Sequence, residues 1–180
     1  MIAVTGYNTT ICQKLRELSD EPMINLRHHP LPEHCSKFVL AQGIMHGQPM
    51  AVLSSVELME SLDVNFVGIV RFCDRILAEN EYARIVVIGS QSAVNGSYDT
   101  MYAGMKAALH CYVRSKPISS TQRLVCLAPG IIADSGMTRR RHDYPEVLVL
   151  RPTCRAIDVA RAAYDVLERP TISPVRVWPI

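Results

Sequence analysis

The 180-residue sequence predicts an α/β fold: about six parallel strands in one doubly wound sheet, with helices covering both faces to give three layers. Short apolar runs alternate along the chain with segments whose apolar residues recur at helical spacing, as in repeated strand–helix–strand units. The run at residues 84–88 is apolar almost throughout, which is typical of a central parallel strand buried on both faces. No internal repeat, low-complexity tract or linker interrupts this pattern, so residues 1–180 are expected to form a single domain.

The individual elements follow from these patterns. Strands are expected at residues 2–4, 22–26, 37–40, 84–88, 124–127 and 175–178. Helices are expected at residues 9–19, 52–79 in two pieces, 100–114 and 155–168. The second piece of 52–79 is apolar on nearly every face, which predicts a helix buried on two sides. Ligands of open parallel sheets bind beyond the carboxyl ends of the strands, so the residues that follow each strand are the candidates for a site.

Composition and charge exclude several classes of function. Apolar residues make up 48% and charged residues 20% of the chain, with a formal net charge of +2, as in an ordinary soluble globular protein. This balance gives no electrostatic case for a nucleic-acid or membrane partner, and the basic run 139–142 is interpreted as a solvated loop. We expect neither a secretory signal nor a membrane span, because no apolar stretch approaches the ~20 residues that a span needs.

The cysteines and histidines predict no metal site. Six cysteines without a CxxC pair are expected to be reduced thiols in a cytoplasmic protein rather than disulfides or zinc ligands. His28 and His29 lie close to His34 and Cys35 in the sequence. Adjacent residues do not share one face of a strand or helix, so this group is not expected to hold a metal ion.

The residues that follow the strand at 84–88 carry the clearest chemistry. Ser90 comes directly after this strand, and the helix at 100–114 then places Tyr102 and Lys106 one turn apart on one face. An ammonium beside a phenol favours the phenolate, so Lys106 is expected to lower the pKa of Tyr102 from its usual value of roughly 10. With a hydrogen bond from Ser90 to a substrate oxygen, these side chains predict a site that moves a proton on or off an alcohol oxygen.

In the order of its motifs the chain resembles the short-chain dehydrogenases/reductases, and the match runs over most of the sequence. Thr5-Gly6 with Ile11 resembles the family's TGxxxGxG cofactor turn, and residues 40–43 stand in the place of its NNAG segment. The other matches are Asn65 in the central helix, Ile88-Gly89-Ser90 at the catalytic-serine strand, Tyr102-x-x-x-Lys106 for YxxxK, and Pro129-Gly130 for the PG segment. The ordered set of Asn65, Ser90, Tyr102 and Lys106 is the specific part of this resemblance.

The resemblance implies a three-layer Rossmann-like NAD(P)-binding domain that transfers hydride between a nicotinamide coenzyme and a carbonyl or alcohol substrate. Tyr102 would be the general acid/base, and Lys106 would lower its pKa and bind the nicotinamide ribose. Ser90 would orient the substrate oxygen, and Asn65 would hold a water in a proton relay to Lys106. The residues expected to bind the coenzyme are Gly6, Tyr7, Asn8, Thr10, Ile11, Arg27, Ala41, Gln42, Gly43, Tyr102, Lys106, Pro129, Gly130 and Ile132. A homodimer or homotetramer through helices near 64–77 and 101–113 is also implied.

The chain departs from the family pattern at the nucleotide end. Thr10 and Cys12 stand where the family has its second and third glycines, and Gln42 replaces a small residue. Only about ten residues separate the second strand from the third, where the family usually fits a helix and another strand, so the edge βα unit is expected to be missing. The segment after Pro129-Gly130 is also short, which predicts a small substrate lid. Arg27 could read a 2′-phosphate and so favour NADP over NAD, or be an ordinary surface arginine.

Two other functions stay open. A trimmed family member could have lost turnover and serve as a cofactor-binding or regulatory module, which the altered glycine turn and the missing edge unit favour. A nucleic-acid role through Arg139–Arg141 would show itself as salt-dependent binding. The intact set of Asn65, Ser90, Tyr102 and Lys106 favours the enzyme.

Overall fold

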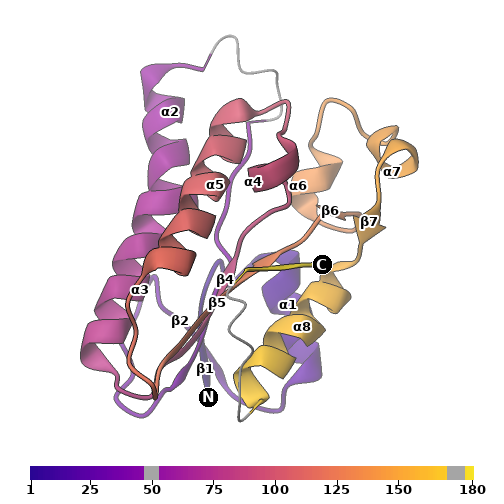
Figure 1. Cartoon of the computed structure of the whole chain (residues 1–180). Coiled ribbons are helices and arrows are strands. Elements are labelled where there is room, and N and C mark those ends of the chain that lie inside the picture. Colours follow the sequence, from indigo (N-terminus) through magenta and orange to yellow (C-terminus); the bar gives the residue numbers. More distant parts are fainter. Residues whose placement is uncertain (47–52, 170–176) are drawn as a thin grey trace.

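The computed structural model describes residues 1–46, 53–169 and 177–180, and its central element there is a six-stranded sheet (Figure 1). The strands are β1 (Ile2–Thr5), β2 (Met23–Asn25), β3 (Lys37–Leu40), β4 (Arg84–Ile88), β5 (Arg123–Ala128) and β8 (Val177–Pro179). They lie in the order β2-β1-β3-β4-β5-β8, and each neighbouring pair is parallel. The chain moves outward from β1 to β2, then returns past β1 to β3, which makes the sheet doubly wound. The predicted Rossmann-like fold is confirmed.

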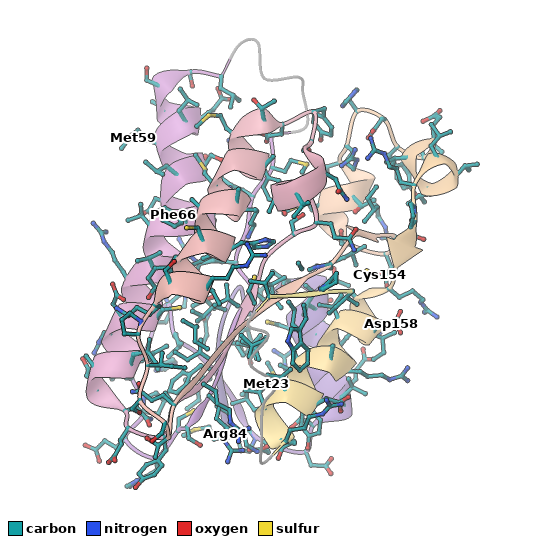
Figure 2. All side chains as sticks on the ribbon, viewed as in Figure 1. Met23, Met59, Phe66, Arg84, Cys154 and Asp158 are labelled. Atoms are coloured by element: carbon teal, nitrogen blue, oxygen red, sulfur yellow. The ribbon has the colours of Figure 1, made fainter. Side chains whose placement is uncertain are left out.

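Helices cover both faces of this sheet and complete three layers (Figure 1). One face carries α1 (Thr10–Leu18) and α8 (Ala156–Glu168), and the other carries α3 (Gly68–Glu79) and α5 (Thr100–Ser115). Successive strand residues point to opposite faces, so in β4 Val86 and Ile88 join one apolar core while Ile85 and Val87 join the other. Figure 2 shows side chains filling the space on both sides of the sheet.

The expected helix at 52–79 is built in three successive parts. Its expected first residue, 52, lies outside the described residues. Helix α2 (Ser55–Leu62) begins with a capping box, in which Ser54 and Glu57 each bond the other's backbone N–H. A π-helical segment, η2 (Asp63–Val67), then leads into α3. A π-helical turn inside an α-helix often lies at a functional position, and this one carries Asn65.

The prediction that the helix at 64–77 is buried on two sides is wrong for the single chain. Ile69, Cys73 and Ile76 are buried against the sheet, whereas Val70 and Phe72 are only half-buried. Within the described residues this helix therefore keeps an apolar face that the sheet does not cover.

The edge of the sheet is as short as the sequence predicted. Residues 26–36, between β2 and β3, form no helix or strand, so the edge βα unit is missing. The sequence did not predict the short elements between β5 and α8: β6 (Ile131–Ile132), α6 (Gly136–Arg139), α7 (Val147–Leu150) and β7 (Thr153–Cys154). It also missed α4 (Ser92–Asn95). Each of these is four residues or fewer, too short to show a periodic apolar pattern.

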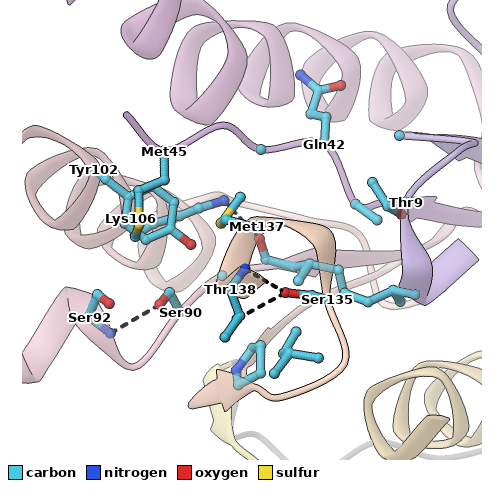
Figure 3. A pocket seen from close by; sticks show the side chains of 18 of the residues that line it. Thr9, Gln42, Met45, Ser90, Ser92, Tyr102, Lys106, Ser135, Met137 and Thr138 are labelled. Atoms are coloured by element: carbon cyan, nitrogen blue, oxygen red, sulfur yellow. Dashed lines mark hydrogen bonds between the residues drawn. The ribbon is translucent and has the colours of Figure 1, made fainter. Parts of the chain in front are cut away.

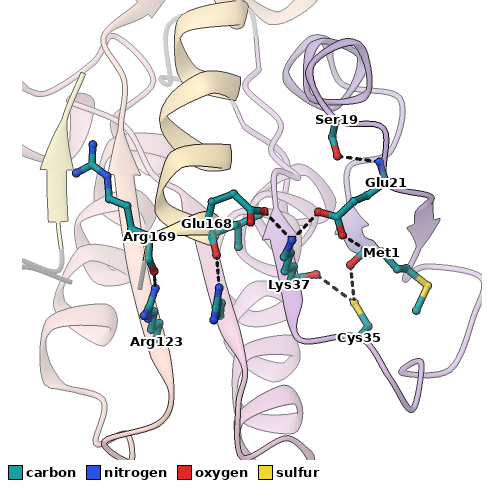
Figure 4. A network of polar contacts seen from close by, with 10 residues as sticks. Met1, Ser19, Glu21, Cys35, Lys37, Arg123, Glu168 and Arg169 are labelled. Atoms are coloured by element: carbon teal, nitrogen blue, oxygen red, sulfur yellow. Dashed lines mark hydrogen bonds and ion pairs between the residues drawn. The ribbon is translucent and has the colours of Figure 1, made fainter. Parts of the chain in front are cut away.

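A polar network joins the elements around the amino-terminal end of β3 (Figure 4). Lys37 forms ion pairs with Glu21 at 2.5 Å and with Glu168 at 2.6 Å, and Glu21 also bonds the amino terminus of Met1. These contacts tie α8 to the start of the sheet. The opposite end of the strands, where their carboxyl ends lie, is left for a binding site.

Candidate active site

A pocket of about 900 Å³ opens at the carboxyl ends of β1, β3, β4 and β5. Its size lies within the range of about 300–1,000 Å³ that small-molecule and cofactor sites occupy. Thr5, Ala41, Ile88 and Pro129, at or just after the ends of these strands, all line it. The pocket therefore sits where ligands of open parallel sheets bind.

Tyr102 and Lys106 come from the first half of α5 and lie together on one side of this pocket (Figure 3). The helix starts where it does because Asp99 caps it, accepting the backbone N–H of Tyr102 at 2.9 Å. Lys106 is only 2% exposed, and its Nζ donates to the carbonyl of Ile88 at 3.1 Å. The same Nζ lies 5.6 Å from the centre of the Tyr102 ring. The predicted pair is therefore brought together at the end of β4.

The electrostatics of the pair differ from expectation. Burial raises the pKa of Tyr102 to about 12, while a hydrogen bond with Ser90 acts in the lowering direction. Burial also lowers the pKa of Lys106 to about 8. The expected lowering of the Tyr102 pKa by Lys106 is not found, because the Lys106 ammonium is directed to the Ile88 carbonyl and the phenol is enclosed. Tyr102 is consequently a protonated phenol at neutral pH.

Ser90 is held from two sides at the end of β4. Its Oγ accepts the backbone N–H of Ser92 at 3.1 Å, and its own backbone N–H donates to Nε2 of His110 at 3.4 Å. His110 is 2% exposed, and burial lowers its pKa to about 4, so Nε2 is a neutral acceptor near neutral pH. A Cβ on Gly89 would lie 2.5 Å from that Nε2, so only glycine allows this approach.

His110 is a residue that the sequence reasoning missed. It lies one turn after Lys106 and two turns after Tyr102, on the buried side of α5. This spacing was the available signal, because residues four apart share a helix face. We assign His110 to holding the backbone of Ser90.

Asn65 is placed behind the pocket, not on its wall. Its Nδ2 donates to the Ile44 carbonyl at 2.9 Å and to Ser61 Oγ at 3.1 Å, and its Oδ1 accepts the Ile44 N–H at 3.0 Å. The side chain therefore clamps the loop that follows β3. A Cβ on Gly43 would lie 3.4 Å from this Oδ1 and 3.8 Å from Lys106 Nζ, so both atoms border the same space. The water relay from Asn65 to Lys106 stays a prediction.

The nucleotide end of the pocket is formed by the turn from β1 into α1. Gly6 has a φ of +65°, and a Cβ there would lie 2.8 Å from the backbone of Ala41, so the turn requires glycine. Thr9 caps α1 through the N–H of Cys12, and the Cys12 thiol packs 3.7 Å from the Thr5 carbonyl. Cys12 therefore serves the helix–strand packing expected of the third glycine.

The turn also fits a phosphate-bearing ligand. The hydroxyl of Thr5 lines the pocket, is buried, and has no hydrogen-bond partner within the described residues. The N-terminus of α1 beside it supplies backbone N–H groups and the positive end of a helix dipole. A dinucleotide is thus compatible with the residues present at both ends of the pocket.

Fifteen expected site residues line this one pocket: Gly6, Tyr7, Asn8, Thr10, Ile11, Arg27, Ala41, Gln42, Gly43, Ser90, Tyr102, Lys106, Pro129, Gly130 and Ile132. Gln42 anchors its loop by donating from Nε2 to the Val64 carbonyl in η2 at 3.2 Å. In Figure 3 the side chains of Met45 and Met137 lie beside Tyr102 and Lys106, which the sequence did not predict. Among the described residues, no group of three or more His, Cys, Asp or Glu could hold a metal, and no helix is long and apolar enough to cross a membrane.

Comparison with solved structures finds the same fold at low sequence identity. A short-chain dehydrogenase/reductase (glucose/ribitol dehydrogenase) from Brucella melitensis is 18% identical, with a TM-score of 0.78 over 99% of this chain and 94% of that one. A serine dehydrogenase complexed with NADP+ is 17% identical, with a TM-score of 0.75 over 100% and 94% of the two chains. A 3-ketoacyl-(acyl-carrier-protein) reductase from Brucella melitensis, complexed with NADH, is 13% identical, with a TM-score of 0.76 over 99% and 95%.

No curated protein matches the sequence. The family model for short chain dehydrogenases, however, matches residues 37–145, which is more than half of the chain. This match spans Ser90, Tyr102 and Lys106, the residues that the fold brings together at the end of β4. The chain belongs to the short-chain dehydrogenase family.

Proposed function

We propose that this protein is an NAD(P)-dependent oxidoreductase that transfers hydride between a nicotinamide coenzyme and a carbonyl or alcohol substrate, with Tyr102 as general acid/base. The observation that carries the proposal is one pocket that holds Tyr102, Lys106 and Ser90 at one end and the Gly6 turn at the other. The whole chain, residues 1–180, would form a single coenzyme-binding domain. Its buried and partly buried free thiols suit the reducing cytoplasm.

The side chains divide the work between proton transfer and orientation. The bound coenzyme would supply or accept the hydride. Tyr102 would hold the proton that moves on or off the substrate oxygen, and the Ser90 hydroxyl would orient that oxygen. Lys106 would place a positive charge near the phenol and bind the nicotinamide ribose. Asn65 would fix the loop at Ile44 and border the path of a water toward Lys106.

The state of Tyr102 favours carbonyl reduction near neutral pH. Its pKa is raised by burial to about 12, so the phenol carries its proton and can donate it to a developing alkoxide. Alcohol oxidation needs the phenolate first. The oxidative reaction should therefore gain rate as the pH rises, while reduction does not.

The function is tested by following the absorbance of NADPH and NADH in the presence of aldehydes and ketones of different size and charge. We expect coenzyme oxidation that depends on the carbonyl compound. The non-catalytic binding module would be favoured if the protein binds a coenzyme but no carbonyl compound oxidises the reduced coenzyme and no alcohol reduces the oxidised coenzyme.

Coenzyme choice depends on Arg27, which is exposed and lines the pocket just beyond β2. We propose that it contacts the 2′-phosphate, so NADPH should bind more tightly than NADH. Because a charged hydrogen bond contributes about 1.5–3 kcal/mol, Arg27→Ala should weaken NADPH binding roughly tenfold or more and leave NADH unchanged. Arg71→Ala, an exposed arginine of α3 outside the pocket, is the control. Equal affinities of the wild type for both coenzymes would show that Arg27 does not read the phosphate.

We also propose a homodimer or homotetramer through the surface of α2, η2, α3 and α5. Val56 and Met59 of α2 are 77% and 64% exposed, and Phe66 and Val70 are half-buried apolar residues of the same helical stretch. An apolar surface of this kind is typical of subunit interfaces. Light scattering should give at least twice the monomer mass of 20.1 kDa. A monomeric mass at micromolar concentration would contradict the proposal.

A further inference from the structure

The segment between β5 and α8 brings a group of arginines to the pocket. Arg140, Arg141 and Arg151 all line it, and the acidic residue of the same segment that lines it is Asp143. Arg140 and Arg151 are exposed and form no ion pair within the described residues. This wall of the pocket therefore carries more positive than negative charge.

Arg141 is fixed in place by three contacts. Its Nε and Nη2 each donate to a carboxylate oxygen of Asp143 at 2.7 Å, which makes a two-pronged ion pair. Its Cζ lies 4.7 Å from the centre of the Tyr98 ring, and Tyr98 donates its hydroxyl to the Met45 sulfur at 3.2 Å. The Arg141 side chain is only 13% exposed. A guanidinium held in this way is pre-oriented, and less side-chain entropy is lost when it binds a ligand.

One end of this guanidinium is left for a ligand. Asp143 takes Nε and Nη2, and Nη1 makes no hydrogen bond within residues 1–46, 53–169 and 177–180. Arg141 and Tyr102 line the same pocket. Burial and the Ser90 hydrogen bond dominate the pKa of Tyr102, but the positive charge of Arg141 also acts to lower it. A group bound to Nη1 would thus share this pocket with the phenol that transfers the proton.

We propose that the substrate carries an anionic group, a carboxylate or a phosphate, which binds Nη1 of Arg141 while its carbonyl oxygen meets Tyr102 and Ser90. This inference rests on the proposed oxidoreductase function. The substrate would be an oxo acid or a phosphorylated carbonyl compound. In its reduction the carbonyl carbon gains hydride from the nicotinamide, the oxygen gains the Tyr102 proton, and the coenzyme becomes oxidised. Arg140 and Arg151 would raise the local concentration of such anions through their charge.

The kinetic test uses pairs of compounds that differ in charge. Acetoacetate and pyruvate are compared with their methyl esters, and dihydroxyacetone phosphate with dihydroxyacetone, so the two arms separate carboxylate from phosphate. We expect kcat/KM to be at least tenfold higher for the charged member of one pair. Arg141→Gln should remove that preference, and Arg139→Gln, an exposed neighbour outside the pocket, should keep it. Neutral members that react as well as the anions in every pair, or a preference retained in Arg141→Gln, would overturn the proposal.

A second measurement does not depend on turnover. Malonate and inorganic phosphate should raise the melting temperature of the wild type above that in neutral malonamide at equal ionic strength. The shift should be lost in Arg141→Gln, reduced in Arg141→Lys, which keeps the charge but not the fork, and kept in Arg139→Gln. If anions raise the melting temperature through Arg141 but no coenzyme binds, the oxidoreductase function is rejected and the anion site is retained. Coenzyme binding with no Arg141-dependent anion effect would reject the anion site alone.

Discussion

Replacing Tyr102 with phenylalanine should lower kcat by about 10²-fold or more, the usual contribution of a general acid or base. The variant keeps the ring, which is 7% exposed and packed within the pocket, and removes only the hydroxyl. Coenzyme affinity and folding stability should change little, because Lys106 keeps its bond to the Ile88 carbonyl and the α5 cap at Asp99 is untouched. Steady-state kinetics beside a coenzyme titration separates the two effects.

The control for this variant is Tyr82→Phe. Tyr82 is a 62% exposed tyrosine that does not line the pocket. It should keep the wild-type rate. Full activity in Tyr102→Phe would mean that another group carries the proton, and a parallel loss of coenzyme binding would mean that the hydroxyl has a binding role instead.

Lys106→Met should give the second large effect, a loss of activity together with a gain in stability. Burial lowers the pKa of Lys106 from 10.5 to about 8, so the folded protein bears the cost of an enclosed charge below pH 8. At about 1.4 kcal/mol per pKa unit this cost is about 3–4 kcal/mol, and about 1 kcal/mol is lost with the hydrogen bond to Ile88. Near neutral pH the variant should therefore be more stable by about 2–3 kcal/mol.

The pH dependence of that gain identifies its cause. Below pH 8 the folded and unfolded chains both hold the proton, so the cost of burial is fully present. Between about 8 and 10.5 the unfolded chain binds more protons than the folded chain, so this group makes the wild type more stable as the pH rises. The stability gain in Lys106→Met should therefore shrink with pH. The buried thiols act in the opposite direction above pH 9. Cys12 contributes equally to both proteins and cancels in the difference, whereas Lys106 acts to lower the pKa of Cys126, so the clearest comparison is below pH 9.

Urea unfolding of both proteins across this pH range measures the gain. Lys14→Met, which removes a partly exposed lysine paired with Glu17, should change stability by less than about 1 kcal/mol at every pH. A stability gain in Lys106→Met that does not vary with pH would show that repacking, not removal of the charge, is responsible.

The sheet and the pairing of Tyr102 with Lys106 could be predicted from the sequence because both rest on strong local signals. The continuous apolar run at 84–88 and the helical spacing of Tyr102 and Lys106 are periodic features, and the structure places them as expected. The short distance between β2 and β3 likewise fixed the missing edge unit through chain length alone.

Other features depend on contacts between segments far apart in the chain. The raised pKa of Tyr102 reflects its burial, and the hydrogen bonds between Asn65 and Ile44 join η2 to the loop after β3. The pairing of Arg141 with Asp143 and Tyr98 belongs to a stretch that lacks a periodic pattern. Sequence spacing reports none of these contacts, so the bonds of Asn65 and the anchoring of Arg141 needed the three-dimensional structure.

Titration of the protein with NADPH and with NADH, followed by nicotinamide fluorescence, shows whether this pocket holds a nicotinamide coenzyme beside Tyr102. We expect a saturable fluorescence change with at least one coenzyme, and the same change in Tyr102→Phe. We also expect loss of binding in Gly6→Val, because a side chain there meets the Ala41 backbone at 2.8 Å in a positive-φ turn. No fluorescence change with either coenzyme, in wild-type protein shown to be folded, would mean that the pocket does not hold a nicotinamide coenzyme.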